Sequence, residues 1–272
     1  MIVVTGARGQ VGSRVNDLLE GLSLKTIPVS RVEGRTPGGQ PYHVGDLSRP
    51  ETLAEPLEAA DQVFLYPDFD RDLVALLAAS RVRRVVLLSS SWVEVNPGTA
   101  IAEKHRRAEE MLLDAGIEST VLRPDTFMTN DHFWFPEVAS GTVATAFPEA
   151  LTAPIACADI AATAVEALHH GSFANESLLI TGDEALTQRE RIQAIADRLG
   201  TPVAVDVIDE GLMRERFSRF MPAVSANEMI DGMLHARTEP LAAAGGFARA
   251  IGRPAVRYRD WLGGDESRYH PA

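Results

Sequence analysis

The 272-residue sequence contains a single cysteine, and this scarcity excludes several kinds of chemistry. With Cys157 alone, the chain can form no intramolecular disulfide and offers no thiolate cluster to a metal ion. Cys157 lies in the apolar run 153–158, where a free cysteine usually behaves as a small buried side chain. We therefore expect an inert core thiol and no metal site.

The sequence also lacks an excess of basic residues and a long uninterrupted apolar stretch. Its formal net charge of −12 opposes binding to nucleic acid, because a duplex-binding surface needs concentrated positive charge. The longest weakly charged stretch, 138–158, contains Glu149, Pro148 and Pro154 and cannot form a membrane-spanning helix. No basic and apolar leader precedes the first predicted strand. We expect a cytoplasmic protein without nucleic-acid or membrane partners.

What the sequence does contain is an alternation of short apolar strands with amphipathic helices. Such alternation predicts an α/β fold, a Rossmann-like doubly wound parallel sheet with helices on both faces. We expect an NAD(P)-binding Rossmann domain at 1–150, to which some later elements, about 151–182, return. Residues 183–272 are then expected to form a smaller, mostly helical C-terminal lobe that binds substrate.

The first predicted strand ends in a glycine-rich loop that indicates dinucleotide binding. Gly6 would permit the turn, Gly9 would let the backbone approach a pyrophosphate, and Gly12 would let the next helix pack close to the strand. The helix N-terminus adds unpaired amides and a favourable dipole for an anion. The predicted cofactor contacts here are Thr5, Gly6, Arg8, Gly9, Gln10, Val11 and Gly12.

The end of the second strand predicts which nicotinamide nucleotide is bound. An acid at this place would bind the ribose hydroxyls of NAD, whereas an arginine suits the 2′-phosphate of NADP. Arg31 stands there, with Ser30 available as a hydrogen-bond partner, so we expect NADPH (NADP) to be preferred over NADH. The alternative is that Glu33, two residues later, supplies the acid.

Other strand ends supply further candidate contacts, because a parallel sheet binds its ligands at the carboxyl ends of the strands. Asp46, followed by Leu47, could accept a hydrogen bond from the adenine amino group or could cap the next helix. Tyr66 and Ser89 directly follow two more strands and are included among the cofactor contacts.

The segment 127–135 is unusually aromatic for a chain with 6 % aromatic residues. By stacking, its rings would suit a flat, polycyclic or quinone-like ligand, although ordinary packing of the lobe on the sheet is the alternative. The predicted substrate contacts are Trp92, Phe127, His132, Phe133 and Trp134.

Five short motifs together point to a known group of proteins. They are Thr5-Gly6-xx-Gly9-xx-Gly12, Gly45-Asp46-Leu47, Leu87-Leu88-Ser89-Ser90-Ser91, Leu122-Arg123-Pro124-xx-Phe127-Met128 and Asp159-Ile160-Ala161. The set resembles the atypical short-chain dehydrogenase/reductases of the NmrA-like group, from the first residue to about Leu199. That group includes NADPH-dependent quinone reductases, ketoreductases of aromatic natural-product pathways, and redox-sensing regulators without known turnover.

The resemblance implies an active site of Ser, Tyr and Lys, from which this sequence departs. In the complete site, Tyr-xxx-Lys places the two side chains on one helix face, where the tyrosine exchanges a proton with the substrate oxygen. Ser91 matches the serine, but His105 stands in place of the tyrosine and Glu109 in place of the lysine. No Tyr-xxx-Lys occurs elsewhere in the chain. Ketoreduction by the usual constellation is therefore excluded.

His105 and Glu109 could instead act as a general-acid pair, because a carboxylate one turn away would raise the histidine pKa. An ordinary surface pair of the two side chains is the alternative. Ser91 could still bind a carbonyl oxygen, and a reduced quinone can take its protons from water.

The sequence therefore predicts an NADPH-dependent reductase of an aromatic, quinone-like or polycyclic carbonyl compound, with a homodimer as one assembly to consider. Two alternatives remain. One is a non-catalytic NADP(H)-binding redox sensor, and the other is an isomerase or dehydratase of the same fold.

Overall fold

Seven parallel strands form the central sheet of the computed structural model, which describes residues 1–238, 241 and 245–268. The strand order is β3-β2-β1-β4-β5-β6-β9, and every pairing within this sheet is parallel. The bounds are β1 (Ile2–Val4), β2 (Thr26–Ser30), β3 (His43–Val44), β4 (Gln62–Leu65), β5 (Arg84–Leu88), β6 (Ser119–Pro124) and β9 (Ser177–Ile180). The predicted doubly wound sheet is confirmed.

The strand order reverses at β1, which pairs with β2 on one side and β4 on the other. Val3 faces Ile27 across one pairing and Val63 across the other. A reversal of this kind opens a crevice at the carboxyl ends of the two neighbouring strands, and doubly wound sheets bind ligands there. The glycine-rich loop leaves β1 at this crevice.

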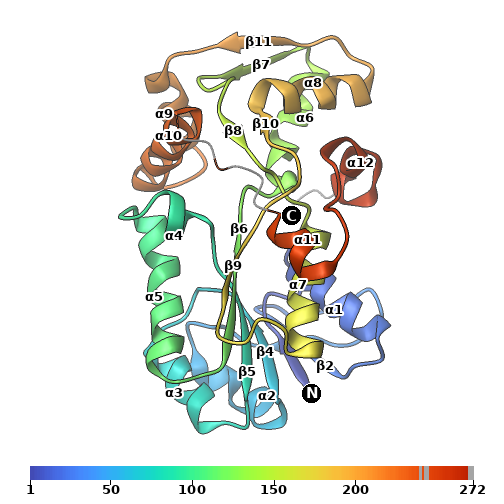
Figure 1. The fold of residues 1–272 in the computed structure, drawn as a ribbon, viewed down its shortest axis with the longest axis vertical. Coiled ribbons are helices and arrows are strands. Elements are labelled where there is room, and N and C mark those ends of the chain that lie inside the picture. Colours follow the sequence, from blue (N-terminus) through green and yellow to red (C-terminus); the bar gives the residue numbers. More distant parts are fainter. Residues whose placement is uncertain (239–240, 242–244, 269–272) are drawn as a thin grey trace.

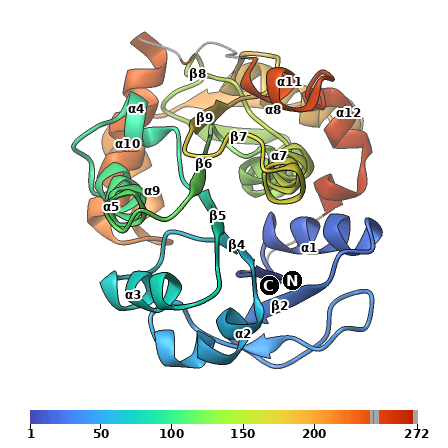
Figure 2. The same ribbon diagram turned by 60° about the horizontal axis from the view of Figure 1, so that its bottom comes forward.

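Helices cover both faces of the sheet, and each face has its own apolar core (Figure 2). On one face, Leu19, Ile160 and Phe247 are fully buried. They belong to α1 (Gly12–Gly21), α7 (Cys157–His170) and α11 (Gly246–Ile251). The other face carries α2 (Ala54–Ala59), α3 (Arg71–Ala79) and α5 (Ala100–Asp114), preceded by the single turn α4 (Trp92–Val95). Both faces of the strands are therefore apolar, as a parallel sheet requires.

A second part of the molecule, here called the lobe, lies above the carboxyl ends of the strands (Figure 1). Its helices are α6 (Trp134–Ala139), α8 (Gln188–Leu199), α9 (Glu210–Ser218), α10 (Ala223–Thr238) and α12 (Tyr258–Gly263). Two small sheets complete it: β7 (Thr142–Thr145) with β11 (Ala204–Val207), and β8 (Leu151–Thr152) with β10 (Leu186–Thr187). Three 3₁₀ helices, η1 (Pro50–Leu53), η2 (Met128–Phe133) and η3 (Asp265–Arg268), lie in connections.

The chain divides between the two parts differently from the predicted boundaries. Residues 128–152 already belong to the lobe, where Val138 packs in one core with Ile195 of α8. Conversely, Phe247 of α11 returns to the core of the sheet. The reason is that β7 finds its partner, β11, about sixty residues later, a pairing that local periodicity does not reveal.

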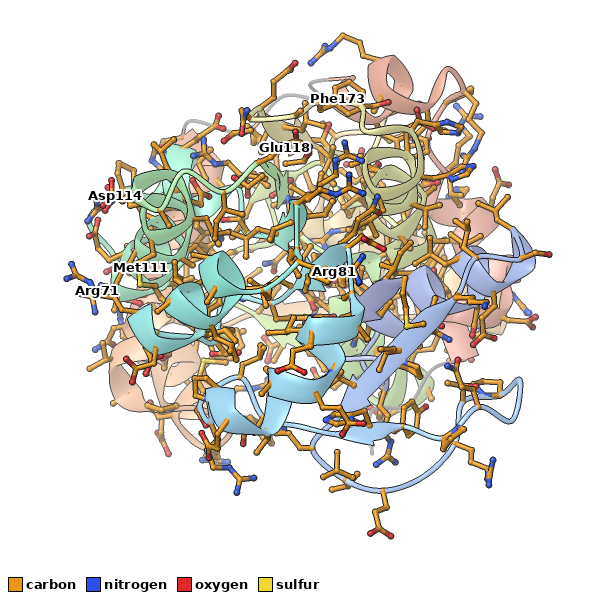
Figure 3. All side chains as sticks on the ribbon, turned by 90° about the horizontal axis from the view of Figure 1, so that it is seen from below. Arg71, Arg81, Met111, Asp114, Glu118 and Phe173 are labelled. Carbon is orange, nitrogen blue, oxygen red and sulfur yellow. The ribbon has the colours of Figure 1, made fainter. Side chains whose placement is uncertain are left out.

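The opposite end of the sheet carries only connections between elements. Figure 3 looks onto this end, where Arg81 and Glu118 lie in the loops that lead into β5 and β6. Glu118 forms an ion pair of 2.7 Å with Arg84 at the start of β5. No helix in the described part of the chain combines the length and apolar character needed to cross a bilayer.

Candidate active site

The loop after β1 has the geometry that its glycines predict. Gly6 has a φ of +58°, in the left-handed region that favours glycine. A Cβ on Gly12 would stand 2.3 Å from the carbonyl oxygen of Gly6, so only glycine lets α1 begin this close to the strand. The Thr5 hydroxyl donates to the carbonyl of Phe64 (2.9 Å) and thereby ties the loop to β4. The loop is thus fixed by backbone contacts.

The N-terminus of α1 opens onto this loop. The N-cap residue, Val11, makes no side-chain hydrogen bond, and the first turn of the helix carries no acidic residue. The amide of Gly12 donates to the hydroxyl of Tyr66 (3.3 Å), whose ring lies against Gly6. A Cβ on Gly9 would stand 3.1 Å from the Gly6 oxygen and 3.3 Å from the Tyr66 hydroxyl. A glycine cradle at a helix N-terminus fits the pyrophosphate of a dinucleotide.

The predicted contacts around this loop differ in what their side chains do. Arg8 is exposed, whereas the side chain of Val11 is fully buried in the core and leaves only its backbone for a ligand. Gln10 turns toward the lobe, where its side-chain oxygen accepts from the Thr129 hydroxyl (2.5 Å). Cys157 lies beside it, and burial raises the pKa of this thiol to about 12. The prediction that Cys157 is buried is confirmed.

At the end of β2, Arg31 is exposed and has no ion-pair partner in the described ranges 1–238, 241 and 245–268. The neighbouring Ser30 is buried, and its hydroxyl accepts from the amide of Val32 (3.2 Å). Glu33 is exposed as well. Arg31 is therefore free to meet a phosphate, while Ser30 shapes the turn that presents it.

The two predicted contacts after β3 are engaged with the protein itself. Asp46 accepts from the amide and the hydroxyl of Ser48 (3.0 and 2.8 Å), a local turn of the kind that aspartate favours. It does not cap the following 3₁₀ helix, whose N-cap is Arg49 and has no side-chain cap. Leu47 packs against the core on the α2 side of the sheet.

A cavity of about 550 Å³ separates the ends of β5 and β6 from the lobe. Its floor is formed by Ser89 to Trp92 and Pro124 to Phe127, directly after the two strands. Met221, Met229 and Met233, from the chain after α9 and from α10, line it from the lobe side. The volume lies within the range of small-molecule sites.

Four of the five predicted substrate contacts line this cavity: Trp92, Phe127, Phe133 and Trp134. The fifth prediction, His132, is wrong as a cavity contact. Its ring stacks on Trp261, with 5.6 Å between ring centroids, and meets the edge of Phe135. In a 3₁₀ helix, successive side chains point about 120° apart, so the members of η2 cannot all face the same side.

His105 projects from α5 into the cavity, and its Nδ1 is buried without a hydrogen-bond partner among the described residues. Burial lowers the pKa of His105 below its usual value, and the charge of Lys104 lowers it further. Glu109 and Asp68 act in the opposite direction but do not prevail. The predicted increase of this pKa is therefore wrong, because the sequence does not show how deeply the ring is buried.

Glu109 is already engaged by other partners. It accepts hydrogen bonds from Ser89 and from the guanidinium of Arg123, whose Nε lies 3.1 Å from Oε1. The same guanidinium also binds Glu94 through Nη1 (2.9 Å). No hydrogen bond joins Glu109 to His105. Glu109 and Ser89 thus belong to a network centred on Arg123 rather than to a pair with the histidine.

Ser91, by contrast, is only 1 % exposed and contacts the cavity together with Asp125. Its hydroxyl forms a hydrogen bond with the Asp125 carboxyl, which also accepts from the amide of Ala153 (2.8 Å). Burial raises the pKa of Asp125, although these hydrogen bonds oppose the shift. Sequence reasoning missed Asp125, although an acid directly after a strand end was a visible signal.

A second arginine–carboxylate pair was also missed. Arg191 of α8 donates from Nη1 to both oxygens of Asp131 (2.7 and 2.9 Å), and the Tyr258 hydroxyl donates to the same carboxylate (2.7 Å). The guanidinium lies 5.0 Å from the ring centroid of Trp134. Arg191 and Asp131 both line the cavity. Asp131, Arg191 and Tyr258 lie from sixty to more than a hundred positions apart in the sequence, so no local pattern predicted their contact.

Comparisons with known proteins agree with this arrangement. Residues 6–171 match the profile of a family described as NAD(P)H-binding. This range begins in the glycine-rich loop directly after β1 and ends just after α7, so it covers β2 and β4, the strands on either side of the crevice. The described residues contain no group of three or more His, Cys, Asp or Glu side chains that could hold a metal ion.

Two relatives match over nearly the whole chain. A (4-alkanoyl-5-oxo-2,5-dihydrofuran-3-yl)methyl phosphate reductase from Streptomyces griseus is 32 % identical, with 96 % of each chain covered. An NAD(P)H azoreductase from Xenophilus azovorans is 27 % identical, again over 96 % of each chain. Among solved structures, an Escherichia coli NADPH-dependent quinone oxidoreductase in complex with NADPH has a TM-score of 0.82. It is 20 % identical over 97 % of this chain and 99 % of its own.

Proposed function

Because the chain belongs to the NAD(P)H-binding family, among the NmrA-like atypical short-chain dehydrogenase/reductases, we propose that it reduces a flat, conjugated carbonyl compound with NADPH. The chain is an NAD(P)H-dependent oxidoreductase. The proposal adds the acceptor class, an aromatic, quinone-like or polycyclic carbonyl compound, and the preference for NADPH over NADH.

The observation that carries the acceptor class is the cavity at the ends of β5 and β6. Trp92, Phe127 and Phe133 supply three aromatic rings to its wall, which suits a flat ligand through stacking. The names of the relatives specify a dihydrofuranone, an azo compound and a quinone, all unsaturated acceptors. An unsaturated acceptor spreads the added electron pair, so it asks little of the protein beyond orientation.

The nucleotide would be held by the glycine-rich loop and by Arg31. Amides at the start of α1 bind the pyrophosphate, where Gly9 leaves room for the phosphates. Arg31 binds the 2′-phosphate, because its guanidinium is exposed and forms no ion pair of hydrogen-bonding length within the described residues, although Asp46 lies near enough to feel its charge. When bound, NADPH supplies a hydride to the acceptor.

The proton for a carbonyl oxygen would come from the cavity floor and from α5. When a substrate binds, the Ser91 hydroxyl turns its single proton from the Asp125 carboxyl to the substrate oxygen and donates to it. His105 donates the proton from the neighbouring helix, because its imidazole enters the same cavity without another partner for Nδ1. A quinone needs neither donor at the moment of hydride transfer, since its reduced oxygens can take protons from water.

The test is NADPH consumption, followed by absorbance, with a panel of quinones and polycyclic ketones. The expected result is oxidation of NADPH that depends on the acceptor and is faster than with NADH. If the protein binds NADPH but consumes none with any acceptor, the non-catalytic sensor is the better explanation. Conversion of a substrate without net loss of NADPH would indicate an isomerase or dehydratase instead.

A further inference from the structure

Unpartnered polar atoms gather at the lobe end of the cavity. A buried polar atom without a hydrogen bond costs about 1–3 kcal/mol, so each one in a folded protein needs a reason. Within the described ranges, three such atoms belong to lobe residues that line the cavity: Trp134 Nε1, Thr152 Oγ1 and Arg191 Nε. They come from α6, β8 and α8. A ligand in the cavity is the partner that would satisfy them.

Arg191 is held in a way that leaves one edge of its guanidinium unused. Its Nη1 alone contacts both oxygens of Asp131, and Tyr258 donates to the same carboxylate. The ring of Trp134 lies along the guanidinium, 5.0 Å from its central carbon. The helix that carries Arg191 starts at a capping box formed by Thr187 and Glu190, which fixes its first turn. The unused Nε is therefore held in place before any ligand arrives.

The chemistry of these atoms specifies what they can bind. An indole N–H and a guanidinium N–H can only donate, so the ligand must present an acceptor atom. The charge of Arg191 is already matched by Asp131, and a second carboxyl, Asp125, lines the same cavity. An anionic group would add negative charge beside two carboxyls, of which only Asp131 forms an ion pair with the guanidinium. A neutral oxygen meets the donors without this repulsion.

We propose that the lobe end of the cavity is a subsite for a neutral carbonyl oxygen of the substrate, bound by Trp134 and Arg191. This oxygen is distinct from the one that is reduced near Ser91. The substrate would thus carry acceptor groups at two ends, one at the strand ends and one under the lobe. The inference rests on the proposed function only for the position of the reacting end.

The test is calorimetric binding to the full-length protein saturated with NADP⁺, so that no turnover is needed. The probes are 2-naphthamide, which carries a neutral carbonyl, and 2-naphthoate, its anionic counterpart. In the native protein, the amide should bind about tenfold tighter than the carboxylate. Trp134→Phe removes the indole N–H together with the five-membered ring, and Arg191→Lys keeps a charge for Asp131 but loses Nε. Each should weaken amide binding about fivefold, the effect of one net hydrogen bond.

The matched control is Trp261→Phe, which makes the same ring change at a tryptophan outside the cavity lining, whose indole N–H donates to Glu266 (3.0 Å). It should change the amide-to-carboxylate ratio less than twofold, by far less than the change at Trp134. The inference is overturned if 2-naphthoate binds as tightly as the amide, or if Trp134→Phe leaves amide binding unchanged. If Arg191→Lys unfolds the protein, amide binding by Trp134→Phe alone still tests whether the subsite exists. A protein that consumes no NADPH would refute the proposed function while these binding ratios still report on the subsite.

Discussion

The loop that faces the nucleotide and the cavity that faces the acceptor are built on different principles. The loop is one continuous segment, 5–12, and its shape follows from backbone contacts that glycine alone permits. The cavity takes its walls from the ends of β5 and β6, from α5, and from most of the lobe. Its polar groups are side chains that meet only after the chain has folded. One site is therefore local in sequence and the other is not.

This difference predicts different responses to mutation. In the loop, one added methyl group changes the space left for phosphate, so single small changes should abolish binding. In the cavity, each polar group either has its own hydrogen-bond partner or lacks one. A single substitution should therefore reduce the turnover of one class of substrate and leave another class unaffected. The predictions that follow test this contrast.

The largest effect is expected for Gly9→Val. The Cβ of the new valine would be in tight contact with the Gly6 oxygen and the Tyr66 hydroxyl. The branched methyl groups would fill the place of the pyrophosphate. NADPH binding, measured by calorimetry, should be abolished while the circular dichroism of the protein is retained. The control is Gly21→Val at the end of α1, where nothing lies within 4 Å of the new Cβ. Normal NADPH binding by the Gly9 variant would refute the loop assignment.

His105→Ala should produce the next largest effect, confined to ketones. Loss of a general acid usually costs about a hundredfold or more in turnover. The donor must carry its proton, and burial lowers its pKa below the usual 6.5. Ketone turnover should therefore fall as the pH rises through a value below 6.5, and this limb should disappear in the variant.

His132→Ala is the matched control, because its ring stacks on Trp261 outside the cavity. It should leave the pH profile of ketone turnover unchanged, and His105→Ala should leave quinone reduction nearly unchanged. If ketone turnover survives in His105→Ala but falls in Asp125→Asn, the proton comes from the Ser91–Asp125 pair instead.

The contrast between the two sites also explains what sequence analysis can reach. The roles of Gly6, Gly9 and Gly12 could be predicted because each depends on the conformation or close approach of backbone only a few residues away. The inner strands β4 and β5 were interpretable for the same reason, since apolar runs of four to five residues specify buried parallel strands. The small strands β7 and β8 were missed because each depends on a partner far away in the chain.

In the cavity, the sequence indicated the aromatic wall but not the charges behind it. Arg191, Asp131 and Tyr258 carry no shared local motif, and their contact depends on how the lobe closes over η2. The pKa of His105 was predicted in the wrong direction, because a neighbouring charge is visible in sequence whereas burial is not. The spacing of charged residues in the sequence alone therefore does not predict the pKa of a side chain in a cavity.

Arg31→Ala tests the nucleotide side again, with a smaller effect. Loss of a charge-assisted hydrogen bond to phosphate should narrow the preference for NADPH over NADH by about 1–3 kcal/mol. The measurement is the ratio of the two dissociation constants. Arg81→Ala, at the opposite end of the sheet (Figure 3), should leave this ratio unchanged. Equal affinities of the native protein for both nucleotides would contradict the role of Arg31.

The smallest effect is expected for Glu109→Gln. This variant tests how the Arg123–Glu109 pair differs from the Arg191–Asp131 pair beside the cavity. Arg123 uses Nε and Nη2 on Glu109 and Nη1 on Glu94, whereas Arg191 leaves Nε unused. The Arg123 network is complete without a ligand, so we interpret it as structural. Because Arg123 keeps Glu94 in the variant, the free energy of unfolding should fall by only about 1–2 kcal/mol in urea.

Ketone turnover by Glu109→Gln should stay close to that of the native protein. The control is Glu110→Gln on the exposed face of α5, which should change stability less because its partner, Arg106, also pairs with Glu103. If Glu109→Gln instead loses ketone turnover as His105→Ala does, the two residues act as a unit. Glu109 would then act through the histidine, whose protonated form its charge favours, and the Arg123 network would belong to the chemistry rather than to the scaffold.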